Sequence, residues 1–526
     1  MSGNAWNVRK VEEGLLVNRG ELFRLGTAVL FIVLIMLFAM VRGPDGPSGT
    51  LLVMAAMIGG YMALNIGAND VANNVGPAVG SHAITLTGAI LIAAVFEASG
   101  ALVAGGDVVG TIKSGIIDPA MIGDTETFIW LMMAGLLAAA LWLNFATAIG
   151  APVSTTHSIV GGVLGAGVAA GGWGIADWGV VGKIAASWVI SPVLGGVIAA
   201  SFLYLIKRTI TYQSDLLAAA QRMAPILIGV MAWAFTTYLM LKGLKKIFPV
   251  GFLTASIVGL IAAAIIWLLM RKYVARVAPG LPNDKEGVNT LFTVPLIFAA
   301  ALLSFAHGAN DVANAVGPLA GISEAVLHGD IAGKAPIPLW VMLVGAAGIV
   351  LGLALYGPKL IRTVGSEITE LDKARAFCVA LAAAITVILA SQLGLPVSST
   401  HIAVGGVFGV GFLREYLKTS YSRMIEEIRE HHRDVESDGE TVESFLERFE
   451  VASVQDKGDM LRKLKSGGTA GALDRNERKG LQKIQRIELV KRTLLLRIAA
   501  AWLITVPAAA MLSAMIFFMI RGALLP

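Results

Sequence analysis

Long apolar stretches separated by short polar ones dominate this chain. Apolar stretches of spanning length, with at most one charged residue each, occur at 26–42, 50–66, 83–104, 128–149, 183–206, 224–241, 250–270, 290–306, 337–357, 376–393 and 497–520. A helix needs about 20 apolar residues to cross hydrocarbon, and backbone groups in lipid must be bonded internally. Stretches this long favour helices over barrel strands. The pattern predicts an all-α, polytopic transmembrane bundle of about 12 helices.

Two blocks of sequence occur twice. Residues 67–77 (GANDVANNVGP) return as 308–318 (GANDVANAVGP), with ten of eleven positions identical at an offset of 241. Residues 152–157 (PVSTTH) return as 396–401 (PVSSTH) at an offset of 244, and a fainter match pairs 188–192 with 502–507 at about 314. The duplication predicts two related halves, the second carrying a late insertion of about 70 residues.

Loop charges predict how the two halves are oriented. The connection 158–182 contains no lysine or arginine, whereas its counterpart, the polar segment 413–490, is rich in both. Equivalent loops are therefore expected on opposite sides of the membrane, as in the inverted-topology repeats of secondary transporters. The predicted organisation begins with an N-terminal segment that contains an extra helix (1–49), a first repeat (50–208) and linking helices (209–289). The first part of a second repeat (290–412), a cytoplasmic polar loop (413–490) and a final helix (491–526) follow.

Composition also supports a membrane protein and excludes several kinds of cross-link and partner. Hydrophobic residues make up 56% of the chain and charged residues 15%, and the mean hydropathy is +0.74. The single cysteine, Cys378, rules out an intramolecular disulfide and a cysteine metal cluster. The net charge of +5 suits basic loops facing anionic lipid, and no interleaving of aromatic and basic residues suggests nucleic acid as a partner. Segment 26–42 lacks a small-residue cleavage site and is expected to remain as a helix.

The first repeated block predicts a cation site. An aspartate at membrane depth costs about 2.5–3.5 kcal/mol, so Asp70 needs a partner or a wet cavity. Asn69 and Asn73 flank it, and nearby glycines with Pro77 are expected to break the helix at the midplane and expose carbonyl oxygens. Carboxylate, amide and carbonyl oxygens suit a hard cation. The second copy repeats this set as Asn310, Asp311 and Asn314. The alternative is that Asn-Asp caps a helix.

The second block predicts an anion site. Proline followed by serine and threonine hydroxyls describes a helix start, and free N–H groups at such a start favour phosphate or sulfate without any lysine. Two copies in inverted halves would aim two helix starts at one point. The alternative is ordinary capping with glycine-mediated packing.

Three further polar residues are candidates for coupling. His157 and His401 are either proton carriers or packing residues that orient the preceding hydroxyls. Glu97 is a lone acid in an apolar helix, with no acidic counterpart in the second half. It is either a cation- or proton-coupling residue or a buried structural group.

At these blocks the sequence resembles the inorganic phosphate transporter (Pit) family, including its sodium-coupled members. The resemblance runs from about residue 50 to the C-terminus and implies a phosphate carrier in which Asn69, Asp70, Asn310 and Asp311 hold coupling cations. It also implies that the anion is surrounded by Asn73, Ser154, Thr155, Thr156, Asn314, Ser398, Ser399 and Thr400. The helix at 26–42 and the late position of the 413–490 insertion depart from the family pattern.

The expected function is secondary active transport of inorganic phosphate in symport with Na⁺ or H⁺, without another cofactor. A multi-pass protein of the plasma membrane, the inner membrane in a bacterium, is expected, and the resemblance implies a homodimer. Three alternatives stay open: a sulfate permease of the same family, a channel, and an intramembrane hydrolase using Ser154 or Thr155 with His157 and Asp70. Duplication weighs against the hydrolase, because two symmetric nucleophile blocks are needless for catalysis. Segment 413–490 is expected to be dispensable for the transport chemistry.

Overall fold

The computed structural model is an almost entirely helical bundle. It describes residues 3–148, 153–243, 250–329, 331, 336–367, 371–431, 447–448 and 492–524. Within these ranges, backbone pairing of the β type is limited to one bridge between Ile117 and Ala176. Eleven segments of the described chain are long and apolar enough to cross a membrane. The all-α membrane bundle expected from the hydropathy pattern is confirmed.

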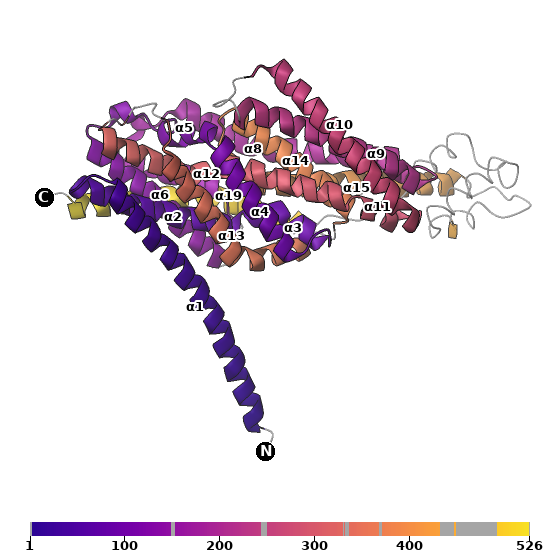
Figure 1. Ribbon diagram of the computed structural model, residues 1–526, viewed down its shortest axis with the longest axis horizontal. Helices are drawn as coiled ribbons and strands as arrows, with labels where there is room; N and C mark the ends of the chain where they lie inside the picture. Colours follow the sequence, from indigo (N-terminus) through magenta and orange to yellow (C-terminus); the bar gives the residue numbers. More distant parts are fainter. Residues whose placement is uncertain are drawn as a thin grey trace, which may run out of the picture.

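Figure 1 labels all of the helices named below except α7, and most of them lie roughly along the long axis of the molecule. Their bounds are α1 Gly3–Arg42, α2 Pro47–Asn69, α3 Val71–Gly80, α4 Leu86–Ala104, α5 Gly106–Ser114, α6 Thr125–Ala148, α7 Thr155–Gly171, α8 Trp178–Ile206, α9 Leu216–Tyr238, α10 Phe252–Val277, α11 Lys285–Leu291, α12 Thr293–His328, α13 Leu339–Glu367, α14 Lys373–Gln392, α15 Ser399–His431 and α19 Arg492–Leu524. Short 3₁₀ or π turns occur at Pro119–Met121, Trp173–Ile175, Lys207–Thr211, Leu239–Gly243 and Ala278–Gly280.

Several helices begin where a short polar side chain caps their free N–H groups. The side chains of Thr85, Asp177, Asp215 and Asp372 accept hydrogen bonds from backbone N–H groups in the first turns of α4, α8, α9 and α14. Such caps satisfy donors that the helix itself leaves unbonded. The polar residues that interrupt the hydropathy pattern therefore also define where these helices begin.

Many of the helix ends gather on two faces of the bundle. The starts of α9 and α14 are tied to the segment around α11: Leu217 N donates to Asn283 Oδ1 at 2.9 Å, and Lys373 Nζ donates to Thr293 Oγ1 at 2.9 Å. We call this end the basic face, because it carries Lys207, Arg208, Arg222, Arg271, Lys272, Arg276, Lys285, Lys373, Arg375 and Arg414. At the other end, Asp118 N donates to Ile175 O at 2.8 Å, which joins the α5–α6 and α7–α8 connections. We call this end the opposite face.

The two copies of the first repeated block fold differently. In the first copy the helix is interrupted at Asp70, between α2 and α3, and Asp70 O accepts a hydrogen bond from Asn73 N at 3.0 Å. In the second copy α12 continues through Asp311 and Pro318. The break expected in both copies is therefore wrong for the second one. Proline removes one hydrogen bond from a helix, but packing on every side of this fully buried segment keeps α12 continuous.

Helices of the two halves are interleaved. The principal contacts pair α2 with α13 and α4 with α12, and likewise α7 with α19 and α8 with α15. Glycines permit the first two of these contacts. Gly67 on α2 lies against the backbone of Ile349, and the equivalent Gly308 on α12 lies against the backbone of Glu97. The two halves therefore share one core instead of forming separate domains.

A methyl group added at Gly308 should destabilise the bundle, because a Cβ there would overlap the carbonyl oxygen of Glu97. Overpacking of this kind costs typically about 1–3 kcal/mol. Gly308→Ala should therefore lower the midpoint of thermal unfolding of the purified protein. Gly182→Ala is the matched control, since a Cβ at this exposed position of α8 meets no atom within 4 Å. Equal midpoints for the two variants would contradict the prediction.

The structure describes parts of the two segments that lie outside the repeats, the N-terminal helix and the polar insertion. Figure 1 shows the N-terminal end of α1 extending away from the bundle, while Ile35 near its other end packs against Gly60 of α2. α15 continues as one helix to His431, beyond the boundary expected at residue 412. The rest of the predicted polar loop 413–490, apart from residues 447–448, lies outside the described residues.

Candidate functional site

Two helix starts meet in the centre of the bundle. α7 begins at Thr155 and α15 begins at Ser399, each following a non-helical approach. The residue before each helix is a serine whose Oγ accepts from a backbone N–H: Ser154 from His157 N at 3.2 Å, and Ser398 from His401 N at 3.3 Å. These two serines, which were expected to contact the anion, thus cap their helices. The following hydroxyls on each helix are available for other partners.

Those following hydroxyls reach the two aspartates. Thr155 Oγ1 donates to Asp70 Oδ2 at 2.6 Å, and Thr400 Oγ1 lies 3.4 Å from Asp70 Oδ1. Ser399 Oγ donates to Asp311 Oδ2 at 3.2 Å. All five side chains are buried, and the one with the greatest exposure, Thr400, is 6% exposed. Asp70 of the first half therefore contacts helix starts from both halves.

Two asparagines tie the hydroxyls together. Asn73 Nδ2 donates to Thr400 Oγ1 at 2.8 Å. Asn314 Nδ2 lies 3.4 Å from Thr155 Oγ1 and 3.2 Å from Thr156 Oγ1. Each asparagine belongs to one half and bonds the helix start of the other. The structure therefore brings eight predicted site residues into one network, buried except at the half-buried Asn73. We call it the central network: Asp70, Asn73, Thr155, Thr156, Asp311, Asn314, Ser399 and Thr400.

Asn69 and Asn310 lie at the edge of this network. Asn310 Nδ2 donates to Ser391 Oγ at 2.9 Å, and its Oδ1 accepts from Val397 N at 3.3 Å. Asn310 therefore holds the extended approach to α15 in place. Asn69, at the end of α2, is half-buried. By the repeat, its corresponding partners would lie in the approach to α7, where residues 149–152 fall outside the described part of the chain.

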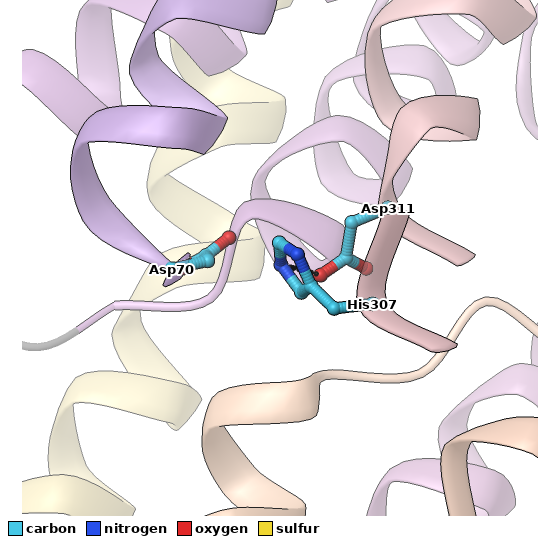
Figure 2. A group of neighbouring side chains, drawn as sticks. All are labelled: Asp70, His307 and Asp311. Carbon is cyan, nitrogen blue, oxygen red and sulfur yellow. Dashed lines mark ion pairs between the residues drawn. The ribbon is translucent and has the colours of Figure 1, made fainter. Parts of the chain in front are cut away.

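A histidine joins the central network to Glu97. His307 Nε2 lies 2.6 Å from Asp311 Oδ2, and His307 Nδ1 lies 2.7 Å from Glu97 Oε2. Glu97 Oε1 also accepts a hydrogen bond from Asn74 Nδ2 at 2.7 Å. Figure 2 shows the His307 ring between Asp70 and Asp311, and one ligand atom from each of the three lies within 4.8 Å of the others. Glu97 thus has a buried hydrogen-bonding role in this structure.

The histidine chain exists in one half only. The residue equivalent to His307 at the repeat offset of 241 is Ile66. Because Gly67 packs on Ile349 as Gly308 packs on Glu97, Ile349 occupies the place equivalent to Glu97. The two repeat-related aspartates therefore have different surroundings: hydroxyl oxygens around Asp70, and an imidazole beside Asp311.

The two histidines of the second block pack against each other. The rings of His157 and His401 have centroids 4.6 Å apart, and the His157 ring meets Trp188 edge-on at 3.8 Å. Trp188 Nε1 in turn donates to Pro396 O at 3.1 Å, in the approach to α15. These contacts hold the two helix starts together and support the packing interpretation of His157 and His401.

The chain matches the model of a known family. Residues 66–513 match the phosphate transporter family. This range includes both repeated blocks and every member of the central network. The chain belongs to the phosphate transporter family. It is consequently an integral, multi-pass membrane protein and not an enzyme, so the hydrolase hypothesis is excluded.

Relatives of this transporter cover most of its length. A protein of Helicobacter pylori strain J99 named "Putative phosphate permease" is 53% identical over 519 residues, 97% of each chain. A similarly named protein of Pyrococcus abyssi is 40% identical over 365 residues, covering 69% of this chain and 89% of its own. Among solved structures, "The sodium-dependent phosphate transporter" is similar with a TM-score of 0.73 and 30% identity, covering 90% of this chain and all of that one.

His307, which contacts Asp311 of the central network, was not predicted from the sequence. The repeat drew attention to positions that are identical in the two halves, and His307 lies immediately before the second copy, where the first has isoleucine. The available signal was the spacing: a histidine four residues before an aspartate lies on the same helix face.

Proposed function

We propose that the protein is a secondary transporter that carries inorganic phosphate in symport with a monovalent cation, and that this cation is sodium. The observation that carries the proposal is the meeting of two helix starts and two aspartates in one buried network. An oxyanion and a cation would bind there side by side. Family membership and the similarity to a sodium-dependent phosphate transporter support this assignment.

The anion would bind between the starts of α7 and α15. Free N–H groups and the positive ends of helix dipoles favour a phosphate without help from lysine. Thr156 and Thr400 add hydroxyl groups at these starts, and Asn73 and Asn314 add amide N–H donors from the other half. A site assembled from both halves can open to either side when the halves rock against each other.

The cation would bind at Asp70. Two hydroxyl oxygens, from Thr155 and Thr400, already surround this carboxylate, and oxygen ligands suit a hard cation such as sodium. A cation at this position also neutralises the negative charge that an approaching phosphate would meet. Asp311, on the far side of His307, completes the charged lining and is a second candidate ligand.

The basic face is assigned to the cytoplasm by its lysines and arginines. Along the chain, α2–α3, α4, α8, α9 and α10 cross the membrane before α12, with the α6–α7 hairpin entering from the opposite face. Five crossings leave α12 antiparallel to α2, which supports the inverted repeat. By this assignment the opposite face is the outer one, and in a bacterium the protein lies in the inner membrane. The homodimer implied by the family resemblance stays a prediction.

Uptake by proteoliposomes that contain the purified protein tests the proposal. Radiolabelled phosphate should accumulate when sodium is higher outside than inside, and labelled sulfate should accumulate far less. If a pH gradient drives phosphate accumulation without sodium, the coupling ion is the proton and not sodium. A preference for sulfate, or phosphate flux that no ion gradient drives uphill, would overturn phosphate symport.

A further inference from the structure

Helix α5 joins three separate parts of the bundle although it is too short to cross a membrane. It spans Gly106–Ser114 and follows α4 directly at Gly105. Thr111 Oγ1 donates to Gly394 O at 2.6 Å, in the approach to α15. Gly394 has a φ of +66°, a left-handed conformation that favours glycine. Because α5 ends at the opposite face, it lies between that face and the start of α15.

The last turn of α5 carries a buried ion pair. Lys113 Nζ bonds Glu324 Oε2 near the end of α12, and each residue is 7% exposed. The pair joins the first half to the second. At the repeat offset of 241, Glu324 corresponds to Ala83, so the duplication does not reproduce this ion pair on the basic face. Removing one partner of a buried ion pair is strongly unfavourable, because the other charge is left uncompensated.

The aspartates and threonines of the central network are buried in this structure. Asp70, Asp311 and Thr156 are 2%, 1% and 0% exposed. Phosphate can reach them from the opposite face only if some element there moves. α5 covers the approach to α15 on this side, and a small cavity at its end is lined by Lys113, Ser323, Glu324, His328 and Pro336. α5 also packs on α12 where Gly317 lies against Ile112, and the cavity beside the ion pair gives the end of α5 room to separate from α12.

We propose that α5 is the gate on the opposite face of this transporter, and that the Lys113–Glu324 ion pair is the latch that keeps it closed. Opening separates α5 from α12, which breaks the ion pair. It also withdraws Thr111 from Gly394, so the start of α15 is released as the gate opens. The gate rests on the proposed alternating-access function, because only a transporter needs to uncover the central network from one side at a time.

A cysteine placed beside the latch reports its state. Ser323 is buried next to Glu324, and its Oγ has no hydrogen-bond partner in the described part of the chain. Ser323→Cys therefore breaks no hydrogen bond that the structure shows. The purified variant in nanodiscs, where both faces are accessible, is treated with a charged maleimide. The native Cys378 is buried, and protein without the reporter measures its background labelling.

The latch predicts the order of labelling rates. Glu324→Gln and Lys113→Met should each accelerate labelling of the reporter about tenfold, which corresponds to about 1.4 kcal/mol in the closed–open equilibrium. The charge-swapped double variant, Lys113→Glu with Glu324→Lys, should return the rate toward that of the parent. Lys242→Met is the matched control: it breaks the ion pair with Asp107 at the other end of α5, which is partly exposed and should contribute little.

Each outcome decides the matter. The gate is overturned if the latch variants leave the labelling rate of the reporter unchanged while the reporter reacts fully after denaturation. So does an equal acceleration by Lys242→Met. If the single variants do not fold, a well-folded charge swap that labels far faster than the parent also overturns it, and slow labelling supports it. Normal phosphate uptake combined with latch-independent labelling refutes the gate alone, whereas a parent protein that carries no phosphate refutes the proposed function.

Discussion

Asp70→Asn and Asp311→Asn are each expected to abolish or sharply reduce sodium-driven phosphate uptake while the protein still folds. Amide and carboxylate have nearly the same shape, and the hydroxyl groups that face these aspartates can bond an amide oxygen as well. What the substitutions remove is negative charge. Without it, a cation loses its principal ligand, and the anion loses the cation that makes its binding favourable.

Thermodynamic linkage between sodium and phosphate binding gives a second test of the aspartates. If sodium increases the affinity for phosphate, phosphate must increase the affinity for sodium by the same factor. Titration of phosphate at several sodium concentrations should therefore show a strong dependence in the parent protein and a weak one in Asp70→Asn. Asp45→Asn, at an exposed position between α1 and α2, is the control and should behave like the parent. Normal uptake with unaltered sodium dependence in both site variants would remove the aspartates from coupling and leave Glu97 as the leading candidate.

The duplication alone predicts equal damage from the two aspartate variants, but the structure distinguishes them. Asp70 faces hydroxyl oxygens, whereas Asp311 shares an oxygen with His307, which Glu97 holds from its other side. Asp311→Asn therefore also disturbs a buried chain of side chains and should lower thermal stability more than Asp70→Asn. A buried polar group left with a poor partner costs about 1–3 kcal/mol.

Thr156→Val and Thr400→Val are expected to weaken phosphate binding roughly ten- to hundredfold, because a hydrogen bond to a charged group is worth about 1.5–3 kcal/mol. Valine keeps the shape of threonine and removes only the hydroxyl. Phosphate affinity measured by calorimetry at fixed sodium concentration provides the test. Unchanged affinity in both variants would exclude these hydroxyls from the anion site.

Two kinds of control separate binding from folding. Thr386→Val removes a buried hydroxyl that bonds the carbonyl of Ala382 in its own helix, and should leave phosphate affinity unchanged. Ser154→Ala and Ser398→Ala remove the caps of α7 and α15. Loss of a cap typically costs about 1 kcal/mol, so these variants should lose stability before they lose affinity.

The sequence by itself determined the class of fold and predicted most members of the candidate site. Hydropathy sets where helices cross a membrane, because burial of apolar side chains in lipid depends only on local composition and length. Repetition marked the candidate residues: a block with ten of eleven identical positions in an otherwise diverged chain contains Asp70 and Asp311. The family resemblance suggested the phosphate and the cation; the family match supports the phosphate, and the cation stays a proposal.

Only the tertiary structure decided which of these groups touch. Ser154 and Ser398 are turned to their own helices, while Thr155 and Ser399 reach aspartates 85 and 88 residues away in the chain. His307 meets Glu97 across 210 residues because two helices approach at Gly308. Such contacts depend on the relative rotation and depth of packed helices. Packing among many residues sets these quantities, and no local pattern in the sequence records them.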